Sequence, residues 1–271
     1  MNNNFKLKRF KLNNFKIKKE HQNYYKENGF ILFSNIFSKE EMKRLNTSVS
    51  QFADKGWHNI MNPDRPEYLA AQSEHLIKKN SLMENINLFE RINNTSNLFR
   101  KYLLDKRIKN IVERLSKFKI MGLMTHVIFK HAKTKYAPMA WEPHQDNSYA
   151  KMGKGNYVTT NLFLDNTSKE NGCLYIFPGT HKLGLLKNFE RKSYLANSKP
   201  GNTVKDKYNK SSKIDLLAKK GDLLIMVGEC IHGSYGNFSK KNNRHMISFN
   251  YGKKDSKFLP GRIAKRTKIY F

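Results

Sequence analysis

Apolar residues in the first 117 positions recur mainly at the spacing of helices. Segment 20–30 reads as a short helix ending at Gly29, because glycine adopts the left-handed conformation of a helix C-terminus at little cost. The apolar run 30–37 predicts a strand. Ser38 and Glu41 then have the spacing of a capping box, so a helix is expected to begin there.

Two longer helices follow from the same spacing. One is predicted over 38–54, and its apolar stripe consists of Met42, Leu45, Val49 and Phe52. The other is predicted over roughly 97–117, with a stripe of Leu103, Ile108, Ile111, Val112 and Leu115. The polar segment between them, 55–96, shows no clear periodicity, and Trp57 and His58 within it are candidates for part of a lid.

After Phe118 the pattern changes to short β-type runs separated by glycine, proline and asparagine. The strands that these runs predict cover 120–130, 156–165, 173–178, 222–228 and 244–252. Many short strands with such turn signals are typical of a β-sandwich or barrel. The chain is therefore predicted to be mainly β with flanking helices.

The same pattern predicts a single domain over 20–271. A helical layer (about 20–117) is expected to pack on a β core (about 118–271). Residues 1–19 are expected to form a basic, loosely held arm. The polar, lysine-rich insert 187–213 is expected to be a mobile loop over one mouth of the core.

Composition fits a folded protein with an unusual charge. Hydrophobic residues make up 38% of the 271 positions, and 51 basic against 22 acidic side chains give a formal net charge of +29. Such a charge favours nucleic acid, an anionic membrane surface or an anionic substrate. The alternative is compositional drift, since the chain is also rich in Asn, Ile, Phe and Tyr. Only 11 of the basic residues are arginine, the side chain that base and phosphate readers prefer, which disfavours nucleic acid as a partner.

Targeting and redox signals are few. No apolar run approaches the roughly 18 residues that a membrane span needs, and the first twenty residues lack the apolar core of a secretory signal. The two cysteines, Cys173 and Cys230, are too few for a disulfide framework. We predict a cytoplasmic protein, and the sequence does not indicate its oligomeric state.

The segment "WEPHQDNSY" (141–149) raises the possibility of a metal site. His144 and Asp146 are two residues apart, a pattern that by itself is usually a polar turn. A third candidate donor, His232, comes four positions after the end of the apolar strand predicted over 222–228. Two imidazoles and one carboxylate on one face of an octahedron are the ligands of non-heme Fe(II) oxygenases, because they leave positions for substrate and oxygen.

A dicarboxylate cosubstrate of such an enzyme needs a cation at its far carboxylate. Arg244 opens the last predicted strand, and its planar guanidinium can bind a carboxylate with two hydrogen bonds. A short hairpin after His232 would bring Arg244 near the metal, and Ser234 could add a hydroxyl donor to the same carboxylate.

Three motifs together resemble the phytanoyl-CoA dioxygenase family of Fe(II)/2-oxoglutarate-dependent oxygenases. They are "PHQDNSY", "LFLDNTSKENGCLYIFPGTHKLG" and "IHGSYGNFSKKNNRHMISFNY", and the opening "YYKENGFILFSNIFSKEEMKRL" is similar as well. The resemblance covers nearly the whole chain apart from the first twenty residues and the insert. It implies a double-stranded β-helix (a cupin-like jelly roll), with Fe(2+), 2-oxoglutarate and O2 as cofactors and ascorbate as an aid in vitro.

The resemblance also implies roles for individual residues. His144, Asp146 and His232 would hold the iron, and Arg244 with Ser234 would bind the distal carboxylate of 2-oxoglutarate. Three further residues are assigned to the cosubstrate pocket or its surroundings: Gln145, His126 and Asn161. Tyr149, Trp141 and Lys130 are substrate-binding candidates, with core packing the alternative for the two aromatic residues and solvation the alternative for Lys130. No side chain beyond the metal ligands is nominated as catalytic.

The reaction expected from the resemblance is hydroxylation of a C–H bond in a small molecule, with release of succinate and CO2. Relatives that halogenate lack the carboxylate that Asp146 supplies, so its presence favours hydroxylation. Two alternatives stay open, a non-catalytic β-sandwich binding protein with a vestigial site and an oxygenase that acts on nucleic acid. The positive charge favours an anionic small molecule as substrate.

Overall fold

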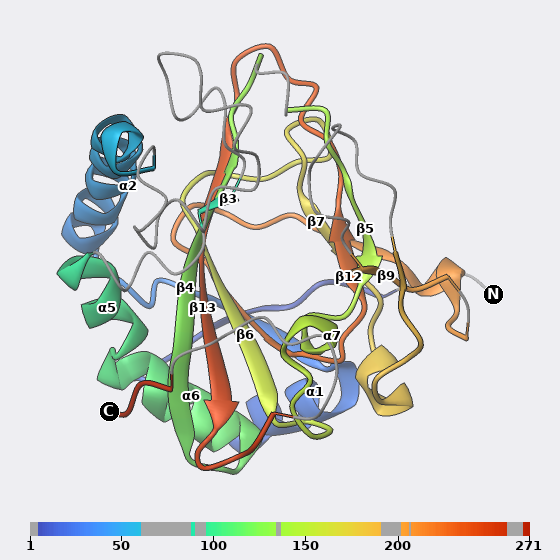
Figure 1. Ribbon diagram of the computed structural model, residues 1–271. Coiled ribbons are helices and arrows are strands. Elements are labelled where there is room, and N and C mark those ends of the chain that lie inside the picture. The colour runs from blue at the N-terminus through green and yellow to red at the C-terminus, as the bar shows by residue number, and fades with distance from the viewer. Residues whose placement is uncertain are drawn as a thin grey trace.

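The computed structural model shows two β-sheets facing each other, with helices against the outer side of the larger sheet (Figure 1). It describes residues 5–60, 88–89, 96–133, 137–190, 202–205, 207–258 and 268–271, and the side chains of 51–60, 88–89, 190 and 202 lie outside this description. The predicted jelly roll with flanking helices is confirmed.

The larger sheet has seven strands in the order β1-β2-β11-β6-β13-β4-β3. In the same order, their bounds are Arg9–Lys11, Phe30–Ser34, Leu223–Val227, Tyr157–Phe163, Arg244–Lys253, Ile120–Lys130 and Leu88–Phe89. The predicted strand 120–130 is confirmed to the residue, and the one predicted over 244–252 is one residue longer. Long antiparallel pairing of β13 with both β4 and β6 makes these three strands the centre of the sheet.

The smaller sheet has four strands in the order β10-β7-β12-β5. Their bounds, in that order, are Ile214–Leu216, Leu174–Ile176, His232–Ser234 and Trp141–His144. Two of these strands, β5 and β12, were not predicted because each is only three or four residues long and carries polar residues. They contain the candidate metal ligands His144 and His232.

The predicted helices form, with changed boundaries. Helix α1 (Lys19–Asn28) ends at Gly29, whose φ of 80° is the left-handed conformation that the sequence predicted. Helix α2 (Lys39–Ile60) runs beyond the predicted end at 54, and the side chains of Trp57 and His58, the candidate lid residues, lie outside the described ones. Its capping box is present, since Glu41 N–H donates to Ser38 Oγ and Ser38 N–H donates to Glu41 Oε2.

The region predicted as one helix over 97–117 is two helices. Helix α5 (Asn97–Leu103) ends at Leu104, and α6 (Lys106–Ser116) starts anew behind Asp105. The Asp105 side chain accepts a hydrogen bond from the Arg107 N–H, the arrangement of an N-cap. A helical stripe alone did not reveal this break, because the apolar positions on both sides still face the same sheet.

Residues 5–19 are the described part of the predicted basic arm, and strand β1 lies within them. Strand β1 pairs in parallel with β2, so residues 9–11 form an edge strand of the larger sheet. Arg9 binds both carboxylate oxygens of Asp222, at 2.8 Å through Nε and 2.6 Å through Nη2. The Phe10 ring packs on His21 and Tyr24 at centroid distances of 5.1 Å.

Side chains of the larger sheet alternate between two apolar cores, as the pleat requires. Residues such as Val127, Ile247 and Phe249 pack against the helices. Residues such as Met246 and Phe163 pack between the two sheets. Polar residues interrupt this second, inner face, and the candidate site lies there.

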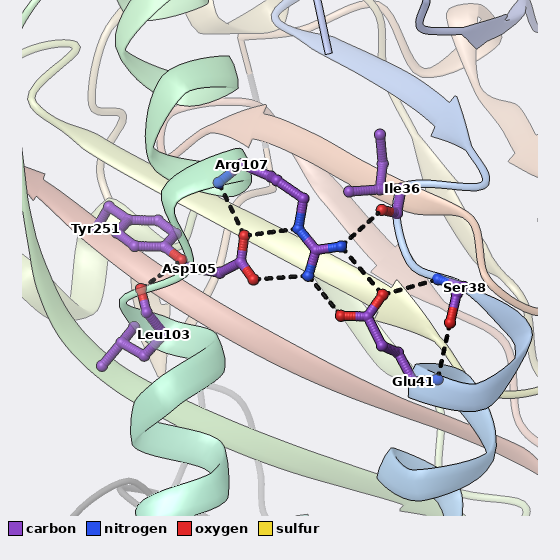
Figure 2. Close-up of polar contacts among 7 residues, drawn as sticks. All are labelled: Ile36, Ser38, Glu41, Leu103, Asp105, Arg107 and Tyr251. Carbon is purple, nitrogen blue, oxygen red and sulfur yellow. Dashed lines mark hydrogen bonds and ion pairs between the residues drawn. The ribbon is translucent and has the colours of Figure 1, made fainter. Parts of the chain in front are cut away.

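A polar cluster joins α2 to α6 on the helical side (Figure 2). The Arg107 guanidinium binds the Asp105 carboxylate through Nε and Nη2, and the Glu41 carboxylate through Nη1 and Nη2. Its Nη1 also contacts the Ile36 carbonyl at 3.5 Å, and its flat face lies 4.7 Å from the Phe37 ring centre. All three nitrogens of this guanidinium therefore donate to protein groups.

The insert 187–213 is only partly described. Strand β8 (Phe189–Glu190) pairs with β9 (Asn202–Thr203), while 191–201 and 206 lie outside the description, so the predicted mobility stays untested. The Pro143 carbonyl, next to His144, accepts hydrogen bonds from Val204 N–H at 2.8 Å and Thr203 Oγ1 at 3.0 Å. One end of the insert therefore lies against β5. Within the described ranges, no helix combines the length and apolar character needed to cross a membrane.

Candidate metal centre

The three predicted ligands meet at one point between the sheets. His144 and His232 are directly opposite each other on the antiparallel strands β5 and β12. Asp146 follows β5 by two residues, and its Oδ1 lies 3.5 Å from His144 Nε2 and 3.6 Å from His232 Nε2. One ligand atom from each residue lies within 4.8 Å of the others, a separation that one metal ion could bridge.

Hydrogen bonds fix the orientation of both imidazoles in the same way. His144 Nδ1 lies 2.7 Å from the Glu142 carbonyl, and His232 Nδ1 lies 3.0 Å from the Cys230 carbonyl. A carbonyl can only accept, so each Nδ1 carries a proton, and in the neutral imidazole Nε2 then keeps its lone pair. This is the tautomer that binds a metal through Nε2.

The protonation states suit a cation as well. Burial would raise the pKa of Asp146, but His232, His144 and the Thr159 hydroxyl together hold it well below its usual range. Burial lowers the pKa of His232 to about 4, although Asp146 opposes this shift. At neutral pH the centre thus offers a carboxylate and a neutral imidazole, the forms in which these side chains ligate metals.

Thr159 on β6 is a contact that the sequence reasoning missed. Its Oγ1 donates to Asp146 Oδ2 at 2.7 Å, which leaves Oδ1 as the oxygen that faces both histidines. Such partners orient a ligating carboxylate. No sequence signal marked Thr159, since threonine is common in strands and the contact joins two separate elements.

Arg244 begins β13 on the inner face and has the largest fully buried side chain among the described residues. Its Nε donates to the Gly172 carbonyl at 3.0 Å, whereas its Nη1 has no hydrogen-bond partner among the described residues. Burial lowers its pKa to about 10, so the group is still charged at neutral pH. A buried cation with an unsatisfied donor is costly to the fold unless an anion is bound there.

Ser234 and Lys130 lie beside Arg244. Ser234 follows His232 by two residues on β12, so both side chains are on the same face of that strand. Lys130 is paired with Arg244 across β4 and β13, and its Nζ lies 2.9 Å from Ser234 Oγ. Only 2% of Lys130 is exposed. The sequence left two alternatives for this residue, a solvated side chain or a contact for an anionic group, and its burial excludes the first.

Gln145 is engaged elsewhere. Its Nε2 donates to the carbonyls of Gly184 and Glu229, and its Oε1 accepts from Leu186 N–H, with distances between 2.7 and 2.8 Å. These contacts favour the alternative in which Gln145 supports the surroundings of the ligands, and its assignment to the cosubstrate stays a prediction. The Gln145 side-chain amide forms hydrogen bonds with two backbone segments, one at Gly184 and Leu186 and one at Glu229. Both segments lie next to the loop that joins His144 to Asp146.

The remaining predicted residues line the same interior. His126 on β4 and Asn161 on β6 are both paired with Ser248 of β13, so the three form one row across the large sheet. The Trp141 ring centre lies 5.9 Å and the Tyr149 ring centre 6.2 Å from that of His144. These positions are compatible with the predicted roles, which stay predictions.

Two histidines and a carboxylate, beside a buried cationic group, define the class of jelly-roll enzymes that use a facial metal triad. Thiolate ligands are absent from the described centre, and the mixed nitrogen and oxygen donors are those that Fe(II) accepts. The donor set and the unsatisfied Arg244 Nη1 thus fit an iron ion with a dicarboxylate.

The chain belongs to the phytanoyl-CoA dioxygenase (PhyH) family, whose profile matches residues 25–246. With this family it is an Fe(II)- and 2-oxoglutarate-dependent dioxygenase, as the sequence predicted.

Individual relatives are distant. The peroxisomal phytanoyl-CoA dioxygenase of Rattus norvegicus is 25% identical over 255 residues, covering 92% of this chain and 72% of that protein. A probable alpha-ketoglutarate-dependent hypophosphite dioxygenase of Stutzerimonas stutzeri is 26% identical, covering 60% of this chain and 53% of its own length. Among solved structures, EctD from S. alaskensis with 2-oxoglutarate and 5-hydroxyectoine has a TM-score of 0.66 at 15% identity, covering 92% and 80% of the two chains.

Proposed function

We propose that this protein hydroxylates a C–H bond of a small molecule at an iron held by His144, Asp146 and His232. The observation that carries the proposal is the convergence of their three ligand atoms, with both histidines in the tautomer that leaves Nε2 free. Bound iron and 2-oxoglutarate supply the oxidising chemistry, in which the cosubstrate loses CO2 and becomes succinate. The protein's own contribution is geometry, charge and exclusion of water.

Each residue has a task in this proposal. The two imidazoles and Asp146 Oδ1 hold the metal on one face, while Thr159 keeps the other Asp146 oxygen engaged. Arg244, with its unsatisfied Nη1, binds the distal carboxylate of 2-oxoglutarate, and the Ser234 hydroxyl donates a hydrogen bond to the same carboxylate. The presence of Asp146 favours hydroxylation over halogenation, because the carboxylate takes the position that a halide would need.

The substrate is the open part of the proposal. The names of the rat and bacterial relatives refer to an acyl-CoA and to hypophosphite, both anionic. The net charge of +29 agrees with an anionic substrate in this chain too. Steering by that charge predicts that added salt lowers the rate with an anionic substrate far more than with a neutral one. The cytoplasmic location stays a prediction, which imaging of a tagged chain would test.

Succinate formation from 2-oxoglutarate under Fe(II), ascorbate and air tests the proposal. Wild-type protein should show slow, iron-dependent turnover, and His144→Ala and Asp146→Ala should abolish it together with iron binding. His181→Ala is the matched control, because His181 lies outside the centre and contacts the Lys26 carbonyl. Iron binding and turnover that survive both ligand substitutions would contradict the proposal.

A further inference from the structure

Lys130 and Arg244 place two cationic side chains side by side at one end of the interior. They are directly opposite each other on neighbouring antiparallel strands, so both side chains point to the same face. Gly172 makes this approach possible. It has a φ of 85°, its carbonyl accepts from Arg244 Nε, and a Cβ added there would come within 3.0 Å of Lys130 Cδ. Like charges opposite each other destabilise a sheet unless an anion joins them.

Three contacts of the Lys130 ammonium group are with neutral oxygens of the protein. Its Nζ bonds the Met139 carbonyl at 2.9 Å, Ser234 Oγ at 2.9 Å and the Tyr235 carbonyl. An ammonium group has three N–H donors, so these three contacts can use all of them. Lys130 therefore ties the smaller sheet to the larger one beside Arg244.

The contact with Lys130 restricts the direction in which the Ser234 hydroxyl can donate its own hydrogen bond. An ammonium group can only donate, so Ser234 Oγ must be the acceptor in this bond. The serine O–H is then left to donate to another group. Ser234 is 1% exposed, so that acceptor is not bulk water.

We propose that Lys130 is a positioning residue for the 2-oxoglutarate site: by holding Ser234 Oγ as an acceptor, it turns the Ser234 O–H toward the distal carboxylate beside Arg244. This inference rests on the proposed function. The location fits, because Ser234 is two residues along the same strand face from the metal ligand His232, about 6.6 Å away by strand rise. Lys130 thereby selects for a 2-oxo acid with a second carboxylate.

Binding to the Zn(II)-loaded protein, measured by calorimetry without turnover, tests this role. Two ligands are compared, 2-oxoglutarate and 2-oxopentanoate, which lacks the distal carboxylate. The variants are Lys130→Met and Lys130→Gln, of which the second keeps N–H donors for the Met139 and Tyr235 carbonyls so that the fold is preserved. Lys119→Met is the matched control, because Lys119 precedes the other end of β4 and its side chain is 78% exposed.

Both Lys130 variants should bind 2-oxoglutarate about tenfold more weakly, the loss expected for one charge-assisted hydrogen bond. Their affinity for 2-oxopentanoate should stay within about twofold of wild type. Lys130→Gln should cause no additional loss in a Ser234→Ala background, because Lys130 acts through that hydroxyl.

Three results would overturn the inference: wild-type affinity for 2-oxoglutarate in Lys130→Gln, equal weakening of both ligands, or fully additive losses with Ser234→Ala. Failure of the wild-type protein to bind either 2-oxo acid would instead refute the proposed function.

Discussion

Arg107 and Arg244 show how differently one protein can surround the same side chain. The half-buried Arg107 is bonded to the carboxylates of Asp105 and Glu41, which raise its pKa (Figure 2). The fully buried Arg244 donates to one neutral carbonyl, has an unsatisfied Nη1, and has a pKa lowered by burial. The first arginine has its counter-charges within the fold, whereas one nitrogen of the second has no hydrogen-bond partner in the part of the chain that the structure describes.

The difference separates a structural charge from a functional one. Burying an ion is tolerable when hydrogen bonds and opposite charge replace water, as at Arg107. Where they do not, the fold accepts a penalty that a ligand can remove, as we propose for Arg244 and a carboxylate. The contrast leads to opposite expectations for the two arginines in binding and in stability.

Of the substitutions considered, replacement of Arg244 should have the largest effect. It should lower the affinity for 2-oxoglutarate without lowering the stability of the fold. Arg244→Met is expected to weaken 2-oxoglutarate binding by on the order of 100-fold, because it removes the cation for the distal carboxylate. Stability should be unchanged or higher, since an apolar group replaces an unpaired buried charge. Calorimetric binding and urea unfolding measure the two effects. A marked loss of stability with retained affinity would reverse the assignment.

Replacing Arg107 should do the opposite. Arg107→Met leaves Asp105 and Glu41 without their shared partner, and we expect the free energy of unfolding to fall by about 2–3 kcal/mol. The same urea titration measures it, and 2-oxoglutarate affinity should stay within about twofold of wild type. An Arg107 variant as stable as wild type would show that the network is only a surface feature.

Acid should weaken the Arg107 network more than the contacts of Arg244, because Arg107 is hydrogen-bonded to carboxylates and Arg244 Nε donates to a carbonyl. The hydrogen bond from Arg107 lowers the pKa of Glu41, so the unfolded chain binds the proton more readily. The stability that this pair contributes is present above the unfolded pKa of about 4.5 and is lost as pH falls through the lower folded pKa. After solvent screening, its size is below about 1 kcal/mol.

Urea unfolding at about pH 6 and about pH 3 tests this expectation, across the window in which a Glu carboxylate titrates. Wild type and Arg244→Met should lose equal stability between these two pH values, and Arg107→Met should lose less. Identical losses in all three proteins would show that the Glu41 pair contributes nothing to acid sensitivity.

The sequence by itself determined the local elements and the order of the chemistry. A β-type run between turn signals specified the long strand β4, and the capping box and Gly29 specified helix ends, because these signals act within a few residues. The series His144, Asp146, His232, Arg244 indicated the chemical class, and the family match agrees with it.

Only the tertiary structure decided which polar groups meet. From the sequence, Lys130 could equally be solvated or bind an anion. In the fold its ammonium group can be buried because the carbonyls of Met139 and Tyr235 accept its hydrogen bonds. The sequence placed Gln145 either at the cosubstrate or around the metal ligands, and only the fold shows that its amide donates to the carbonyls of Gly184 and Glu229. The sequence predicted a loosely held arm over 1–19, and only the fold shows that Arg9 in this segment forms an ion pair with Asp222. Hydrogen-bond partners from distant segments leave no periodic trace in the sequence, so satisfaction of a buried polar group can be judged only in the folded chain.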